Sequence, residues 1–331
     1  MNPESPWWLF MLLALMAGFG GGDFSSYMPS TSLFFPKRLQ GTALGIQAGI
    51  GNFGVSIAQF VTPWIIGFAV FGALAGEPQL MQLNGETRPV WLQNAAFVYA
   101  PLLLLMTVLA WVFLRRVPVK ASFREQLDIF RNKHTWFCTI TYVMTFGSFS
   151  GLSAAFPLMI KTVYGDFPEA PDPLTYAFLG PLIGSAVRVL FGPVADRIGG
   201  GILTHFVGLG LLTTAVVMVL SGVLTPTSFD SFPLFVILML LMFFFSGVGN
   251  ASTFRQFPVI FAHSPRQAAG VIGWTAAVAA YGPFLFSILI GTSISSTGSA
   301  VPFFLAVAGY YLIATAINWW YYTRNGAEKP S

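Results

Sequence analysis

The sequence predicts an all-α polytopic membrane protein with about nine transmembrane helices. Of its 331 residues, 55% are hydrophobic and only 8% are charged, whereas roughly 25% of the residues of soluble globular chains are charged. The mean hydropathy is +0.71, and long apolar runs recur along the whole chain. A water-soluble fold is excluded, because 16 basic and 12 acidic side chains are too few to cover a soluble protein of 35.9 kDa.

Nine apolar runs are expected to cross the membrane as helices, because each can span about 30 Å of hydrocarbon. Charged and turn-forming residues separate the runs. The ends of each run are predicted with a precision of several residues. The runs extend approximately from Trp7 to Phe35, Gly45 to Gly72, Val90 to Leu114, Thr135 to Val163, Leu174 to Ala195, Ile202 to Leu224, Leu234 to Phe261, Ala268 to Ile294 and Val301 to Thr323.

The loop charges predict the orientation of the spans, because cytoplasmic loops carry an excess of Lys and Arg. One set of alternate loops contains Lys37, Arg38, Arg115, Arg116, Lys120, Arg124, Arg131, Lys133, Arg197, Arg266, Arg324 and Lys329. The opposite set contains Arg88, has Lys161 near a helix end, and is otherwise acidic. We therefore expect an outside amino terminus, a cytoplasmic carboxyl terminus and a location in the plasma or inner membrane.

A basic linker and an internal repeat predict the domain organisation. Residues 115–134 are interpreted as a cytoplasmic linker between a partial bundle of three spans, residues 1–114, and a six-helix bundle, residues 135–331. A shift of 227 residues matches the first hairpin of spans to the seventh and eighth, pairing Gly20 with Gly247, Gly22 with Gly249, Asp23 with Asn250, Phe34 with Phe261 and Gln40 with Gln267. The first span then corresponds to helix four of twelve, and three helices are expected to be missing before it.

Three ionisable residues are expected inside the bilayer, where a charge costs about 2.5 kcal/mol or more and therefore indicates function. They are Asp23, Arg188 and Arg255. Arg188 lies too deep in its span to reach the interface easily, so its planar fork of donors predicts capture of an anion. The alternatives are an interfacial arginine or a structural ion pair, for example with Asp23. Arg255 lies nearer the cytoplasmic end, where a pair or a loop anchor is the stronger interpretation.

Glycine clusters mark three spans, at residues 18–22, 45–54 and 247–249. Glycine in a membrane helix usually permits close contact with another helix. Asn52 and Asn250 directly follow two of these clusters, and a buried amide beside bare backbone can donate hydrogen bonds to a small ligand. Asn52 is the better candidate, because the glycines around it leave its stretch of helix with few bulky side chains.

Two further patterns fit a transport site and its gate. Tyr142 and Phe146 are four residues apart on one helix face, where they either pack or form an apolar wall beside Arg188. The segment from Gly192 to Gly200, Gly-Pro-Val-Ala-Asp-Arg-Ile-Gly-Gly, closes the fifth span on the cytoplasmic side. An aspartate there, Asp196, is expected to cap or pair at a hinge between helices.

No enzyme motif is recognised in the sequence. A metalloprotease helix, a nucleophile elbow and a phosphate-binding loop are not found, and the three histidines lack ligand-like spacing. The one cysteine, Cys138, lies in an apolar run and excludes an intramolecular disulfide. We therefore expect no enzyme activity, no cofactor, no metal and no nucleic-acid partner.

Several segments, in fixed order, resemble the nitrate/nitrite porters of the major facilitator superfamily. They are Gly-Gly-Gly-Asp-Phe-Ser-Ser at 20–26, Phe-Phe-Pro-Lys-Arg-Leu-Gln-Gly-Thr-Ala-Leu-Gly at 34–45, Gly-Ile-Gly-Asn-Phe-Gly-Val-Ser at 49–56, Thr-Phe-Gly-Ser-Phe at 145–149 and Gly-Pro-Leu-Ile-Gly-Ser-Ala-Val-Arg at 180–188. The resemblance covers nearly the whole chain. It implies a fold of twelve helices in two bundles, with one anion site between them.

The resemblance also implies roles for individual residues. Arg188 would bind the anion, and its neighbours in the site would be Tyr142, Phe146, Phe24, Asn52, Gly49, Gly51 and Thr275. The gating motif would comprise Gly192, Asp196, Arg197 and Gly199, with Arg255, Asn250 and Asp23 as secondary candidates. Ala48 and Ala276 depart from the family's glycine and serine. The family's second arginine lies on a helix that this sequence does not contain.

The leading hypothesis is transport of nitrate or nitrite by alternating access, as an antiporter or a proton symporter, in the service of nitrate assimilation. Its partners would be the anion, the lipid bilayer, protons if it is a symporter, and the missing amino-terminal helices. The alternatives are transport of another small monovalent anion, or a non-transporting membrane fragment that acts as an assembly partner.

Overall fold

The computed structural model describes residues 5–83, 86–115 and 122–331. In these ranges, nine helical stretches are long and apolar enough to span a membrane. They are Trp7–Phe34, Lys37–Ile65, Asn94–Phe113, Lys133–Tyr164, Leu174–Ile198, Gly200–Leu220, Phe229–Ile260, Pro265–Thr297 and Val301–Thr323. The predicted all-α membrane fold is confirmed. The largest difference is in the second span, which begins at Lys37 and ends at Ile65, several residues before the expected positions.

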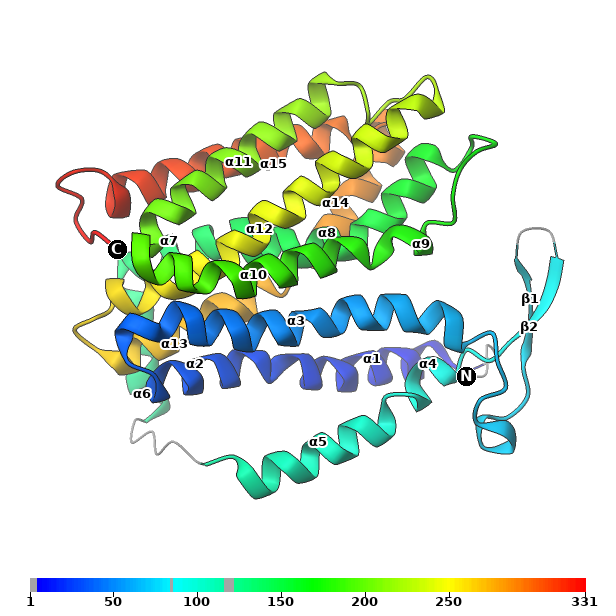
Figure 1. Cartoon of the computed structure of the whole chain (residues 1–331), viewed down its shortest axis with the longest axis horizontal. Helices are drawn as coiled ribbons and strands as arrows, with labels where there is room; N and C mark the ends of the chain where they lie inside the picture. The colour runs from blue at the N-terminus through cyan, green and yellow to red at the C-terminus, as the bar shows by residue number, and fades with distance from the viewer. Residues whose placement is uncertain (1–4, 84–85, 116–121) are drawn as a thin grey trace. The chain divides into compact units, whose positions relative to one another are not determined.

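Most spans contain more than one helical element (Figure 1). The α-helices are α1 Trp7–Gly22, α2 Phe24–Phe34, α3 Gln40–Ile65, α4 Asn94–Phe97, α5 Ala100–Phe113, α6 Phe123–Gln126, α7 Lys133–Tyr142, α8 Ser148–Met159, α9 Leu174–Ala177, α10 Leu179–Ile198, α11 Gly200–Leu220, α12 Phe232–Ile260, α13 Pro265–Ala279, α14 Gly282–Thr297 and α15 Val301–Asn318. The 3₁₀ turns are η1 Lys37–Leu39, η2 Gly72–Ala75, η3 Leu127–Arg131 and η6 Phe229–Ser231, and the π-helical turns are η4 Val143–Gly147, η5 Ile160–Tyr164 and η7 Trp319–Thr323.

The described residues form two compact units, each considered separately. The larger unit contains residues 22–56 together with 122–331, and the smaller contains residues 5–21 together with 57–115. In the larger unit, α10, α11, α12 and α15 pack side by side (Figure 1). The same unit pairs α8 with α14 and α13 with α2. This unit contains Arg188 and the residues expected around it.

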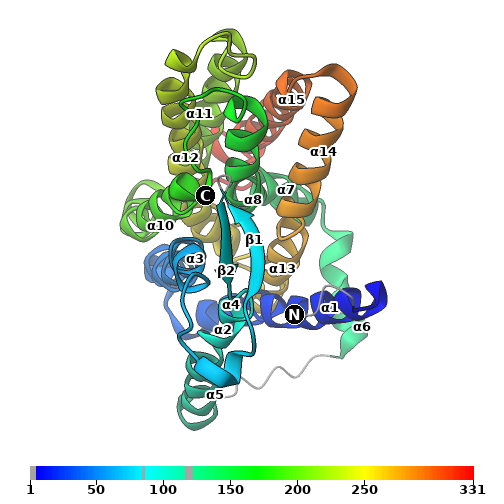
Figure 2. The ribbon, with the colours of Figure 1, turned by 90° about the vertical axis from the view of Figure 1, so that its right-hand side faces the viewer.

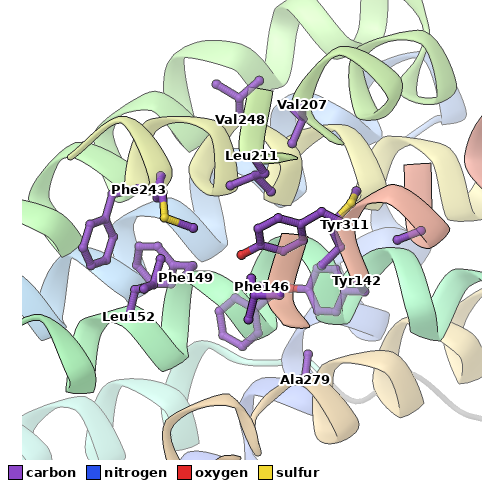
Figure 3. Packing of buried hydrophobic residues seen from close by; sticks show 14 of the residues in the cluster. Tyr142, Phe146, Phe149, Leu152, Val207, Leu211, Phe243, Val248, Ala279 and Tyr311 are labelled. Atoms are coloured by element: carbon purple, nitrogen blue, oxygen red, sulfur yellow. The ribbon is translucent and has the colours of Figure 1, made fainter. Parts of the chain in front are cut away.

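Close approach of glycine to aromatic rings sets the packing of α10 against its neighbours. A Cβ added to Gly184 would lie 2.6 Å from the Phe149 ring, closer than real Cβ contacts, and 3.1 Å from the carbonyl oxygen of Phe243, closer than most of them. Phe243 and Phe149 are both buried, and their rings meet edge to face at 6.0 Å. Figure 3 shows these two rings beside Tyr142 and Phe146 in the same apolar core.

The smaller unit contains α1, the end of α3, a β-hairpin, α4 and α5. Strands β1 Gln79–Leu83 and β2 Glu86–Val90 are antiparallel, with Gln79 opposite Val90 (Figure 2). The buried Asn94 side chain donates to the carbonyls of Ile65 and Phe68, at 3.2 and 2.7 Å. These bonds tie the start of α4 to the end of α3 and to the turn that follows it. The sequence analysis did not anticipate the hairpin.

Candidate anion site

Arg188 lies in α10 and is completely buried. Its Nη2 donates to the Tyr142 hydroxyl at 3.5 Å, the long limit of a hydrogen bond, while Nε and Nη1 have no partner among the described residues. Nε carries one N–H and Nη1 carries two of the five guanidinium donors. No carboxylate in the described ranges pairs with Arg188. Asp23, considered as its partner, is exposed at the start of α2.

Three aromatic rings surround the Arg188 guanidinium. Its central carbon lies 5.0 Å from the ring centroid of Phe254, 5.9 Å from that of Phe146 and 6.0 Å from that of Phe24. The rings also stack on one another, with Phe24 and Phe146 at 5.4 Å. Tyr142 joins the stack at 5.4 Å from Phe146 and 4.7 Å from Phe254. The structure thus brings Phe24, Tyr142 and Phe146 to Arg188.

Phe254 is the site residue that the sequence analysis missed. It belongs to α12, is fully buried, and has the shortest ring distance to Arg188 of the three. A signal was available in the sequence. Phe254 follows Asn250 by four residues, so the two side chains share one face of a helix. A buried aromatic in that position extends the wall formed by Tyr142 and Phe146.

A π-helical turn lies within the wall that Tyr142 and Phe146 form. η4 begins after Tyr142 and includes Phe146. A π-turn adds one residue to a helical turn, so it changes which side chains share a face, and such turns occur frequently at functional sites. Phe149, three residues after Phe146, continues the stack at 6.0 Å from Phe146. Figure 3 shows Tyr142, Phe146 and Phe149 following one another in this part of the core.

The balance of energies around Arg188 favours an anion as its partner. A charged arginine at the centre of a membrane helix costs about 2.5 to 3.5 kcal/mol on insertion scales. A cation–π contact to a ring offsets about 0.5 to 2 kcal/mol of that cost. A charge-assisted hydrogen bond contributes about 1.5 to 3 kcal/mol, and the donors without a partner can form several. The arrangement can therefore hold a small anion between a guanidinium fork and aromatic walls.

The glycines of α3 permit close packing against α10 (Figure 2). A Cβ on Gly45 would lie 3.1 Å from the carbonyl oxygen of Arg188, and a Cβ on Gly49 would lie 3.0 Å from that of Ser185. Gly49 therefore lets the two backbones approach. Gly51 and Gly54 have no such neighbour within 4 Å, so they lie on the other face of α3.

The remaining predicted site residues lie in two different environments. Asn52 is 8% exposed, and its Nδ2 has no hydrogen-bond partner among the described residues. Asn52 shares one face of α3 with Gly49 and Ser56. Gly49 packs against α10, and the Ser56 hydroxyl donates to the Phe178 carbonyl at 2.9 Å. Asn52 therefore faces the first turns of α10. Thr275 is buried in α13, and its hydroxyl donates to the carbonyl of Ile272 in its own helix at 3.1 Å.

Asp196 connects three helices at the end of the unit that is predicted to be cytoplasmic. Its carboxylate accepts hydrogen bonds from the backbone N–H of Gly41 at 2.9 Å, and from the N–H and hydroxyl of Thr42 at 2.7 Å each. A carboxylate at the first turn of a helix, here α3, is favoured by the free N–H groups and the helix dipole. Arg255 Nε lies 2.9 Å from Asp196 Oδ1, within ion-pair distance but without the alignment of a hydrogen bond.

The other residues of the Gly192–Gly200 segment support this junction. A Cβ on Gly192 would lie 2.8 Å from the carbonyl oxygen of Gly41, so only glycine allows α10 and α3 to meet there. Gly199 has φ of +96° and links α10 to α11, a conformation that favours glycine. Arg197 is exposed. The Arg255 side chain belongs to this junction through its ion pair with Asp196.

The fold and site together define a membrane transporter: the chain belongs to the Major Facilitator Superfamily, whose sequence profile matches residues 2–258. Within that superfamily it belongs to the nitrate/nitrite porter family. It is 62% identical to the "Probable nitrate/nitrite antiporter NarK2" of Thermus thermophilus over 330 residues, which cover 99% of this chain and 74% of the relative. It is also 35% identical to the "Nitrate/nitrite transporter NarU" of Salmonella typhimurium, covering 99% and 73%.

Solved structures agree on the fold. The fucose:proton symporter FucP of Escherichia coli superposes with a TM-score of 0.62, covering 89% of this chain and 72% of that protein at 12% sequence identity. The relatives and this structural neighbour are transporters rather than enzymes, as the sequence predicted. The protein is accordingly a multi-pass membrane protein of a transporter family.

Proposed function

We propose that the protein moves nitrate and nitrite across the membrane by alternating access, and that Arg188 binds the anion. The observation that carries this proposal is the buried Arg188 guanidinium, which has donors without a partner and lies among Phe24, Phe146 and Phe254. The names of the similar transporters from Thermus and Salmonella supply the substrate. Exchange of nitrate for nitrite is the mode we favour, since the similar Thermus protein is named an antiporter.

The aromatic walls explain how one arginine can select a small flat anion. Dehydrating the anion is costly, and charge-assisted hydrogen bonds from the guanidinium replace part of its hydration. The buried aromatic rings exclude water from the guanidinium, which strengthens the attraction between opposite charges. A flat anion with delocalised charge can lie parallel to such rings while its oxygens meet the guanidinium. Tyr142 adds a hydroxyl next to the guanidinium.

The Asp196 junction is proposed as the gate. It joins α3, α10 and α12 at one end of the larger unit, and Lys37 adds a hydrogen bond from its Nζ to the Ala262 carbonyl at 3.1 Å. Opening this end requires these contacts to break together. Gly192 would allow the close contact between α10 and α3, and Gly199 would form the turn around which the helices separate.

The proposal includes the predicted orientation and division into bundles. The Asp196 end faces the cytoplasm, residues 1–114 belong to the amino-terminal bundle, and residues 135–331 form the other bundle. Phe24 on α2 and Arg188 on α10 then reach the anion from opposite bundles. Helices corresponding to the quarter of the Thermus relative that this chain does not match would complete the first bundle and the site.

Uptake of labelled nitrate into proteoliposomes loaded with nitrite tests the function. The 331-residue chain and the same chain completed with the unmatched quarter of the Thermus relative are reconstituted side by side, with chloride and formate as competitors. We expect saturable uptake by at least the completed chain, stimulated by internal nitrite and resistant to chloride. Uptake by neither protein, or equal competition by all anions, would contradict the proposal.

A further inference from the structure

A second buried polar side chain on α12, Asn250, remains unexplained by the packing. It has no exposed surface, and neither its Nδ2 nor its Oδ1 has a hydrogen-bond partner among the described residues. Its neighbours on the same helix differ in this respect. The hydroxyls of Ser246 and Thr253 are buried too, but each donates to a carbonyl of its own helix, at 3.1 and 2.8 Å. Buried amides are normally paired, so Asn250 requires a partner that the described side chains do not provide.

The register of α12 against α10 places Asn250 next to Arg188. Gly247, three residues before Asn250, contacts α10 at Val187, where an added Cβ would lie 2.6 Å from the side chain. Phe254, four residues after Asn250, lies 5.0 Å from the Arg188 guanidinium. Residues at these spacings share one helix face. Asn250 therefore faces α10 between the two contacts, at the level of Arg188.

The polar atoms of Arg188 and Asn250 that lack partners are mostly hydrogen-bond donors. Arg188 supplies only N–H donors, through Nε and Nη1, and the Asn250 amide supplies two more N–H donors and one acceptor oxygen. Donors thus outnumber acceptors. The group that satisfies them must accept several hydrogen bonds that arrive from different directions.

We propose that Asn250 is a second anion-binding residue, which contacts one oxygen of the anion while Arg188 contacts another, and that it selects polyatomic oxyanions over halides. The inference rests on the proposed function of Arg188. A planar oxyanion carries separate acceptor oxygens for the guanidinium and the amide. A halide is a single small centre, so two donors spaced for separate oxygens of a planar anion cannot both reach it at hydrogen-bond distance. Asn250 is a specificity residue of the site, and its Nδ2 donates to an oxygen of the anion.

The test is equilibrium binding of nitrate and of chloride to purified variants of the chain, completed as described above. Asn250→Leu keeps the side-chain size and removes the hydrogen bonds. We expect it to weaken nitrate binding about tenfold, which corresponds to roughly 1.4 kcal/mol, and to leave weak chloride binding unchanged. Ser246→Ala, a buried change one turn earlier on α12, serves as the matched control and should bind nitrate normally.

A second variant, Asn250→Asp, keeps the shape and introduces a charge. At neutral pH its carboxylate should pair with Arg188 and abolish nitrate binding, while elution as a monodisperse species shows that the protein is folded. Either Asn250 variant binding nitrate like the wild type would overturn the inference and leave the role of Arg188 intact. Equal losses of nitrate and chloride binding in Asn250→Leu would overturn the claim of selectivity. If the wild-type protein itself bound no nitrate, the proposed function would fail first.

Discussion

At the scale of single residues, Arg188 is the centre of the proposed site, because it is buried and no described carboxylate forms an ion pair with it. Among the described residues, the basic side chains that do form ion pairs lie nearer the ends of the helices or in loops, as Arg255 and Arg266 do. Arg188 has a weak hydrogen bond to Tyr142 and aromatic faces around it. Those faces position the guanidinium without neutralising it, so its charge remains available to a ligand.

The ring of Phe254 should matter more to anion binding than that of its neighbour Phe257. Phe254→Leu removes the ring at 5.0 Å from Arg188 and 4.7 Å from Tyr142, where aromatic pairs contribute about 0.5 to 1.5 kcal/mol. We expect nitrate affinity to fall roughly threefold to tenfold. Phe257→Leu is the control: Phe257 is equally buried and meets Tyr142 edge to face at 6.0 Å. Titration calorimetry that found equal effects for the two variants would remove Phe254 from the site.

Sequence reasoning found Arg188, Tyr142 and Phe146 but not Phe254. The cost of a buried charge made Arg188 visible without any coordinates. Phe254 is one of 34 phenylalanines in the chain. Its spacing from Asn250 was a weak signal, and its distance of 5.0 Å from the Arg188 guanidinium became visible only in the structure. Likewise the unpaired state of Asn250 depends on what surrounds it, which spacing along the chain does not reveal.

At the scale of elements, hydropathy predicted the spans well because lipid imposes a minimum length of apolar helix. It could not predict the π-turns η4 and η5, since one extra residue per turn hardly alters an apolar run. The hairpin β1–β2 was missed because each strand has only five residues and lies between two spans. Asn84 and Gly85, a typical hairpin-turn pair, stand between the strands and lie outside the described residues.

The gate makes a prediction about α3. In Asp196→Asn the side chain loses its charge, its ion pair with Arg255 and one of its two acceptor oxygens. The amides of Gly41 and Thr42 should then exchange hydrogen for deuterium faster, measured by mass spectrometry on peptides covering the start of α3. Asp128→Asn, which changes a carboxylate elsewhere in the same unit, should leave those peptides unaffected. Unchanged exchange in Asp196→Asn would mean that the junction is held by packing alone.

The start of α13 is anchored to the linker turn η3 by Asp128. Its carboxylate accepts hydrogen bonds from the Arg266 guanidinium and, at 2.9 Å, from Gln267 Nε2. The hydrogen bond from Arg266 lowers the pKa of Asp128 below its ordinary value of 3.8. A lowered pKa in the folded protein means that the contact stabilises it above pH 4 and is lost as the pH falls through the lowered value.

Asp128→Asn should therefore destabilise the protein by about 0.5 to 1 kcal/mol at most, because both partners are partly exposed to solvent. Thermal unfolding in detergent should show the same difference from wild type at pH 8, 7 and 5. The difference should shrink only below about pH 4. A difference that disappeared between pH 7 and pH 5 would assign the effect to another group.

At the scale of the whole molecule, charge distribution rather than packing determines the orientation in the membrane. We predict that the β1–β2 hairpin is extracellular, and that the linker and the end of the last helix are cytoplasmic. Reporter fusions at Lys120 and after Tyr322 should indicate the cytoplasm, and a fusion at Glu86 should indicate the exterior. A cytoplasmic reporter at Glu86 would invert the topology and place the Asp196 junction outside.

The central claim is that the guanidinium of Arg188 binds the anion, and equilibrium binding of labelled nitrate to Arg188→Lys tests it most directly. Lysine keeps the charge but loses the planar fork of donors. We expect nitrate affinity to fall tenfold or more, or about 1.4 kcal/mol, in protein that remains folded and monodisperse. Arg124→Lys, an exposed change in the linker, should bind like the wild type. Undiminished nitrate binding by folded Arg188→Lys would contradict the account.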